Sequence, residues 1–236
     1  MPRQCRLQAA GVTAHVIQRG NNRQVCFFTD DDCQFFLGCL DKAAKRYRCS
    51  IHAYVLMTNH FHLLLTADLE TGLSLFMKLL EQRYVQYVNR CYHRSGSLWD
   101  GRFRSSLVQS ERYILACYRY IELNPVRAGM VKHPSEHRWS SYSANAQGAR
   151  AARLTPHGEY LALGHDGAAR QNAYGNLFVD ELDRPLLKRI RECAHGGYAL
   201  GNDRFRGDVE HVLMRPAAPR RPGRPPLNRT SVPALS

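Results

Sequence analysis

The sequence lacks long hydrophobic runs. No apolar stretch approaches the roughly 18 residues that a membrane-spanning helix requires. Residues 1–5 (MPRQC) also lack the hydrophobic stretch of a signal peptide. These two absences argue against a membrane partner or a membrane-spanning chain, and we expect a cytoplasmic protein.

Closely spaced cysteine pairs are also missing. The chain has 8 cysteines, but no two of them form a C-x-x-C pair. This absence argues against a zinc ribbon and against a thioredoxin-type dithiol. We therefore interpret most of the cysteines as reduced, small core residues.

Acidic residues are few relative to basic ones. The chain has 20 Asp plus Glu against 33 Lys plus Arg, a formal net charge of +13. Such an excess favours a polyanionic partner, with nucleic acid as the first candidate and an anionic membrane surface as the second. Hydrophobic residues make up 44% of the chain, enough for one main domain with an appendage.

The first half of the chain predicts an α+β fold. Its periodicities indicate strands at 12–19, 51–57 and 61–66, a short strand within 97–109, and helices at 30–47, 74–92 and 110–124. This order predicts an antiparallel sheet with helices on one face. Thr58 and Asn59 should form the turn of a hairpin, and the last helix should stop near Asn124 because Pro125 disfavours helical geometry in the residue before it.

The second half of the chain is less regular. Residues 143–175 are rich in Ala, Gly and Arg and predict a linker with weak helices. Two basic amphipathic helices, 183–194 and 203–214, flank a Gly-Gly turn; the spacing permits a helix-turn-helix pair, although such pairs are common in any helical appendage. Residues 215–236 hold six prolines, five arginines and no acid, which predicts a disordered basic tail.

The segment His60-Phe61-His62 is a candidate metal site. On a strand, this spacing points both imidazoles to one face and turns Phe61 into the core. The apolar run 63–65 that follows indicates a buried strand, which is a rigid support for a site. A pair of packed or surface histidines is the alternative, because H-x-H arises by chance fairly often.

Tyr120 and Asn124 are four residues apart on a predicted helix and so share a face. A divalent ion on His60, His62 and Asn124 would polarise a phosphate as a Lewis acid. Tyr120 would then attack phosphorus, release a 3′-hydroxyl and store the bond as a phosphotyrosine. Tyr113 and Tyr118 compete for this role, and any of the three could simply be packed; the spacing to Asn124 favours Tyr120.

Basic and aromatic residues alternate between residues 83 and 104. Arg83, Arg90, Arg102 and Arg104, interleaved with Tyr84 and Tyr87, suit a groove that tracks phosphates and stacks unpaired bases. A solvated helix face with its aromatics in the core is the alternative, at least as good for Tyr84 and Tyr87. Arg102 and Arg104, beside the proposed metal, are better candidates for phosphate contact.

Several segments together resemble a known family. T-N-H-F-H-L-L-L (58–65) and R-Y-I-E-L-N-P-V-R-A-G (119–129) resemble the single-tyrosine HUH transposases, and among these the REP-associated tyrosine transposases, which act on repetitive extragenic palindromes. Further matches are S-G-S-L-W-D-G-R-F-R-S (95–105), Q-R-Y-V-Q-Y-V-N-R (82–90) and W-S-S-Y (139–142). The resemblance covers roughly residues 10–143.

The resemblance implies a ferredoxin-like catalytic domain at 1–143 that acts on single-stranded hairpin DNA with Mg²⁺ or Mn²⁺. His60 and His62 would be metal ligands, Asn124 the third ligand and Tyr120 the nucleophile. Residues 144–214 would be a helical extension, with DNA binding as one role to test, followed by the tail. The chain could act as a monomer or a homodimer, in the cytoplasm at the nucleoid.

Two other functions are weighed against the transposase. The first is a protein that keeps the fold and binds hairpin DNA without cutting it; the presence of all four proposed catalytic residues favours the enzyme. The second is a metal-dependent hydrolase of the H-x-H barrel type. That barrel needs about 250 residues of alternating strands and helices, a pattern that this sequence lacks.

Overall fold

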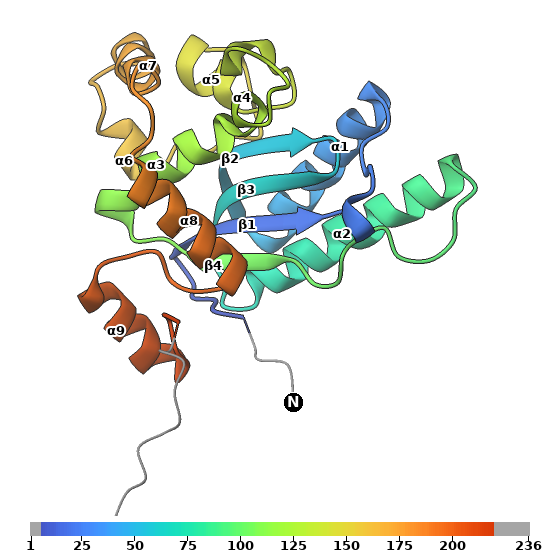
Figure 1. Ribbon diagram of the computed structural model, residues 1–236, viewed down its shortest axis with the longest axis horizontal. Coiled ribbons are helices and arrows are strands. Elements are labelled where there is room, and N and C mark those ends of the chain that lie inside the picture. The colour runs from blue at the N-terminus through green and yellow to red at the C-terminus, as the bar shows by residue number, and fades with distance from the viewer. Residues whose placement is uncertain (1–5, 220–236) are drawn as a thin grey trace, which may run out of the picture.

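The computed structural model describes residues 6–219 (Figure 1). Most of the predicted basic tail, residues 220–236, lies outside the described residues. The nine helices of the described part are α1 Asp30–Tyr47, α2 Gly72–Cys91, α3 Ser110–Glu122, α4 Asn124–Arg127, α5 Tyr142–Gln147, α6 Gly158–Leu161, α7 Gly167–Asn176, α8 Arg184–Gly196 and α9 Asp203–Leu213. Two 3-10 turns, Asn21–Arg23 and Pro134–Glu136, precede α1 and α5, respectively.

Four strands form one antiparallel sheet. They are β1 Thr13–Arg19, β2 Cys49–Met57, β3 His60–Ala67 and β4 Arg104–Leu107, and their order in the sheet is β2-β3-β1-β4. With one helix after β1 and another after β3, this is the ferredoxin-like arrangement. The predicted α+β class is confirmed, and the sheet is unlike the eight-stranded barrel of the alternative hydrolase.

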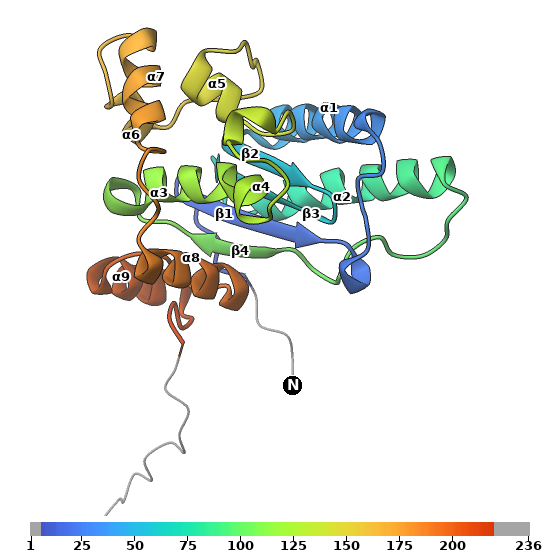
Figure 2. The same ribbon diagram turned by 45° about the horizontal axis from the view of Figure 1, so that its top comes forward.

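Helices cover both faces of the sheet, so the prediction of helices on one face is wrong. α1 and α2 contact one face, while α3 and α8 contact the other, and α8 crosses over β4 and β1 (Figures 1 and 2). The reason lies in the three-leucine run of β3. Leu63 and Leu65 pack under α1 and α2, whereas Leu64 packs on the α3 side, and a strand that is apolar on both faces must be covered on both.

Local signals set the bounds of α1. The side-chain oxygen of Thr29 accepts a hydrogen bond from the backbone N–H of Asp32, and the carboxylate of Asp32 accepts one from the N–H of Thr29. This capping box fixes the first turn. The observed bounds equal the predicted ones, because the cap and the buried positions Phe36 and Leu40 belong to the same local pattern.

The β2–β3 hairpin forms as predicted. Met57 pairs with His60 in the register of the two strands, so Thr58 and Asn59 make the turn and the histidines stand at its end. The chain between α3 and α4 also follows the prediction, since α3 ends at Glu122. It then re-enters a helical turn, because Pro125 is tolerated in the first turn of a new helix.

The segment predicted to be a linker is packed against α3. Its helices α5, α6 and α7 bury Tyr160 and Tyr174 beside Tyr118 of α3. Glu122, fully buried at the end of α3, accepts hydrogen bonds from Ser141, Asn145 and Tyr174. Scattered tyrosines among small residues thus anchor a segment whose average composition suggests a linker.

The chain after α8 is tied to the sheet. The N–H of Leu200 donates to the carbonyl of Leu107 (2.7 Å), and the N–H of Gln109 donates to the carbonyl of Leu200 (2.9 Å). Farther on, Ala217 is buried and its carbonyl accepts from the N–H of Ala199 (2.8 Å). Ala217, which lies in the part predicted as the start of the disordered tail, is therefore packed. DNA reading by the α8–α9 pair stays a prediction.

The sequence predicts reduced, mostly buried cysteines and no membrane-spanning helix. The described cysteines are all free thiols, and all of them except Cys91 are buried. Within residues 6–219, no helix combines the length and the apolar character needed to cross a membrane.

Candidate active site

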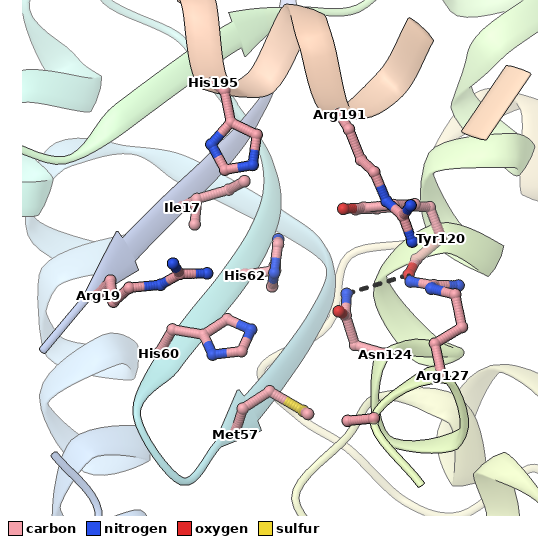
Figure 3. Close-up of a pocket in the computed structure, with 11 residues that line it drawn as sticks. Ile17, Arg19, Met57, His60, His62, Tyr120, Asn124, Arg127, Arg191 and His195 are labelled. Carbon is pink, nitrogen blue, oxygen red and sulfur yellow. Dashed lines mark hydrogen bonds between the residues drawn. The ribbon is translucent and has the colours of Figure 1, made fainter. Parts of the chain in front are cut away.

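A pocket of about 260 Å³ lies between the sheet, the α3–α4 corner and α8 (Figure 3). It brings together the four residues predicted to do chemistry, which come from β3, α3 and α4. The residues that line it are Ile17, Arg19, Met57, His60, His62, Tyr120, Asn124, Arg127, Ala128, Arg191 and His195. None of these described lining residues is Asp or Glu, so the charged groups of the pocket are cationic.

The two histidines of β3 each have one ring nitrogen already engaged. Nδ1 of His60 lies 2.7 Å from Oδ1 of Asn59, and Nδ1 of His62 lies 2.9 Å from Nε2 of His15 on β1. The His60 and His62 rings are 5.2 Å apart between centroids. These contacts orient both rings and leave Nε2 of each available for a metal ion.

Burial keeps these imidazoles neutral near pH 7. Loss of solvent lowers the pKa of His60 to about 4 and that of His15 to about 3. The pKa of His62 also falls well below its ordinary value, chiefly by burial and then because His15 and His60 stand close by. A neutral imidazole offers the lone pair that a metal ion requires.

Tyr120 stands at the centre of the pocket. In Figure 3 its hydroxyl oxygen points into the space between His62 and α8. The ring lies edge-on to His62 at 5.8 Å, and the guanidinium of Arg127 lies over the ring at 4.5 Å from its centre. Arg127 also donates to the backbone carbonyl of Tyr120, which holds this cation next to the phenol.

The two competing tyrosines of α3 lie elsewhere. The hydroxyl of Tyr113 accepts a hydrogen bond from Arg189 (3.0 Å). Tyr118 is fully buried where α3 packs against α6, and its hydroxyl accepts a hydrogen bond from the N–H of His157 (3.3 Å). Neither lines the pocket that holds the histidine pair. The assignment of the nucleophile to Tyr120 stays a prediction, but among these three only Tyr120 has the required placement.

Asn124 can complete a metal-binding set. Its side-chain nitrogen donates to the carbonyl of Tyr120 (3.1 Å), which leaves the amide oxygen for a metal ion. Two imidazole nitrogens and one amide oxygen suit a divalent ion with open positions, and imidazole favours Mn²⁺ over Mg²⁺. Within residues 6–219 no cluster of three or more His, Cys, Asp or Glu residues offers another such site.

The structure divides the four arginines predicted to bind DNA. Arg102 and Arg104 line a small hollow that shares Arg19 and His195 with the pocket. By contrast, Arg83 and Arg90 are exposed on α2, on the opposite face of the sheet. The aromatics beside them are packed, because Tyr84 is buried and Tyr87 stacks on Phe35 at 3.9 Å.

Sequence reasoning missed several polar residues of the site, among them Arg19 of β1. Arg127 follows Tyr120 by seven residues but lies beyond the predicted end of that helix, so helical spacing did not point to it. His15 is a single histidine in a buried strand, and no local pattern links it to His62, 47 positions later. Arg191 and His195 enter from α8, and their arrival depends on how that helix packs.

Comparisons with known proteins bear on the family and the fold of the chain. The family model for IS200-like transposases matches residues 8–124, about half of the chain. A solved REP-associated tyrosine transposase bound to a REP hairpin aligns with a TM-score of 0.50 and 20% identity, over 66% of this chain and 93% of that one. A protein assigned as a transposase from Deinococcus radiodurans R1 aligns with a TM-score of 0.37 and 21% identity, over 51% and 96%.

A search of the curated proteins found no match. The family match and the fold together define a protein of the transposase class. More particularly, the chain belongs to the IS200-like transposase family, and its fold is that of the REP-associated tyrosine transposases.

Proposed function

We propose that this transposase cleaves and rejoins single-stranded hairpin DNA through a phosphotyrosine intermediate, with Tyr120 as the nucleophile and a divalent metal ion as cofactor. The observation that carries the proposal is the meeting of His60, His62, Tyr120 and Asn124 in one pocket whose charges are cationic. A phosphodiester is the anionic group that such a pocket suits.

The proposed reaction exchanges one ester for another. The hydroxyl oxygen of Tyr120 attacks phosphorus and loses its proton, the bond between phosphorus and the 3′-oxygen breaks, and that oxygen takes up a proton to become a 3′-hydroxyl. The DNA 5′-phosphate then remains on Tyr120 until a 3′-hydroxyl attacks it and restores a phosphodiester. Because bonds are exchanged rather than hydrolysed, no energy-rich cofactor is required.

The residues around Tyr120 support this reaction by position and charge. The guanidinium of Arg127, held 4.5 Å from the centre of the phenol ring, stabilises the negative charge that develops on the attacking oxygen. His15 orients His62, and Asn59 orients His60. A metal ion bound by His60, His62 and Asn124 would act as a Lewis acid on the phosphate.

Hairpin DNA is the substrate that we favour. The solved neighbour of similar fold was captured on a REP hairpin. The net charge of +13 supplies the electrostatic attraction that any nucleic acid would need. We expect this reaction to take place in the cytoplasm, at the nucleoid.

A covalent-adduct assay tests the proposal. The protein is incubated with labelled single-stranded hairpin DNA and Mg²⁺ or Mn²⁺, and a denaturing gel reveals any protein–DNA adduct. We expect an adduct with the parent protein, none with Tyr120→Phe, and none in excess chelator, while Tyr113→Phe and Tyr118→Phe retain it. Tight hairpin binding by the parent with no adduct would instead support the alternative of a binding protein that does not cleave.

A further inference from the structure

Helix α8 carries two polar side chains into the pocket from outside the family-matched region. Arg191 and His195 are four residues apart, so they share one face of the helix. Both line the pocket with Tyr120, and Figure 3 shows both side chains extending from α8 toward it. Both residues are exposed. The family model ends at residue 124, so nothing in that match accounts for them.

The position of α8 is built into the fold. Its neighbouring face, with Ile190, Cys193 and Ala194, is buried in the core on the α3 side. At its end, Ser106 of β4 donates a hydrogen bond to the carbonyl of Tyr198 (2.6 Å). Together with the hydrogen bond from Leu200 to Leu107 of β4, these interactions fix α8 against the sheet. The backbone positions of Arg191 and His195 are therefore fixed relative to the pocket.

A second arginine orients His195. Nη1 of Arg104 donates to the carbonyl of His195 (3.0 Å) and lies 3.3 Å from its Nδ1. Because a guanidinium only donates, Nδ1 accepts in this contact, and a neutral ring then carries its hydrogen on Nε2. Burial and the charges of Arg104 and Arg19 lower the pKa of His195, which favours that neutral form. His195 can thus offer an N–H donor.

The cations in this pocket stand near one another without a lining carboxylate. Burial and the nearby charge of Arg191 lower the pKa of Arg127 to about 10, whereas an ionised Tyr120 would raise it. Such a group of like charges is unfavourable until an anion binds. A phosphate satisfies it best, because a guanidinium can donate two parallel hydrogen bonds to two phosphate oxygens.

We propose that Arg191 and His195 of α8 bind the scissile phosphate of the DNA strand, opposite the histidine pair of β3. The active site is then composite, and the segment after the family-matched core supplies two of its catalytic residues. This inference rests on the proposed function, because it concerns the same pocket and the same phosphodiester. The alternative is that α8 only covers the pocket and hinders access of the DNA to Tyr120.

The first test compares matched variants of α8 in the adduct assay. We expect Arg191→Ala to slow adduct formation about 100-fold, the effect typical of a lost donor to a developing anion. Arg191→Lys should recover part of the rate, because it keeps the charge but not the paired donors. His195→Ala should slow the reaction about 10-fold, and His195→Gln, which retains a side-chain N–H donor, should recover part of that rate.

Lys188→Ala is the matched control. It removes one positive charge from the same helix, but Lys188 is exposed, pairs only weakly with Glu192 (3.9 Å) and lines neither hollow. We expect the parental rate from it. Thermal unfolding of every variant checks that the fold is retained.

The second test measures binding to the phosphate itself. In a Tyr120→Phe background, affinity is compared for two oligonucleotides, one with the natural phosphate and one with an uncharged methylphosphonate at the position that the parent cleaves. We expect the uncharged linkage to weaken binding about 10-fold, and this difference to shrink at least threefold when Arg191→Ala is added. An unchanged difference would overturn the inference.

The outcomes separate the two proposals. A parent protein that forms no adduct contradicts the proposed function. A parent that forms the adduct, with Arg191→Ala as fast as Lys188→Ala, contradicts only the role of α8. Faster cleavage by Arg191→Ala would show that α8 hinders the reaction, which also overturns the inference.

Discussion

The two faces of the sheet have different roles: one is apolar core, and the other carries the residues of the pocket. The face under α1 and α2 is a continuous apolar core that includes Phe61, Leu63 and Leu65. The face under α3 and α8 places His62 and His15 among polar and cationic neighbours, and it opens into the pocket. Alternation along β3 makes this possible, because neighbouring residues of one strand serve opposite faces. One face therefore stabilises the strand that presents the chemistry of the other.

The sharpest test of this difference between the two faces is to substitute two neighbouring residues of β3, one on each face. Phe61→Ala should lower the free energy of unfolding by about 3–5 kcal/mol, because it removes a fully buried ring. His60→Ala should abolish cleavage and leave hairpin affinity nearly unchanged, because affinity comes mainly from counterion release. Chemical denaturation and the adduct assay measure the two effects. A cleaving His60→Ala protein would end the metal-ligand assignment.

A second difference between the two faces is a fully buried carboxyl, that of Glu122 at the end of α3. Burial raises the pKa of Glu122 to about 7, and its three hydrogen-bond donors oppose this rise only in part. The folded state therefore favours the protonated form, so stability is full below the unfolded pKa of about 4.5 and falls as pH rises to about 7.

We expect a loss of at most about 3 kcal/mol between these two pH values, measured by urea denaturation. Glu122→Gln should flatten this pH dependence. A parental stability that rises over the same range would mean that Ser141, Asn145 and Tyr174 keep the carboxylate charged in the folded protein.

Deletion of the basic tail tests whether the affinity for hairpin DNA arises from the pocket face alone. Hairpin binding should weaken steeply with salt, and deletion of residues 220–236, which contain four arginines, should reduce the slope of log K against log salt by up to about 3. Sequence preference should survive, because counterion release by arginines does not depend on the base sequence of the DNA. Loss of preference with an unchanged slope would assign base reading to the tail.

The smallest expected effect compares arginines on the two faces. Arg102→Ala with Arg104→Ala should weaken hairpin binding several-fold, because both line the hollow beside the pocket. Arg83→Ala with Arg90→Ala, on α2, should change it less than twofold. Fluorescence anisotropy at fixed salt measures both. An equal loss from the two pairs would mean that the DNA also wraps the α1–α2 face.

Much of the fold could be predicted because its signals are local. The capping box at Thr29 and Asp32, the turn at Thr58 and Asn59, and Pro125 each act on neighbouring residues. The segment 143–175 could not be predicted in this way. Its packing depends on Tyr160 and Tyr174 reaching a buried carboxyl and a tyrosine on α3, and average composition does not register such single anchors.

The sequence by itself determined the elements of the core and which side chains could perform chemistry. The strand period puts His60 and His62 on one face, and the helix period puts Asn124 beside Tyr120. Only the tertiary structure decided what joins them. His15 reaches His62 because β1 pairs with β3. Helix α8 brings Arg191 and His195 to the pocket across β4 and β1, while α2 carries Arg83 and Arg90 to the other side. These outcomes depend on which faces of distant elements bury each other, a choice made by the whole core rather than by any local pattern.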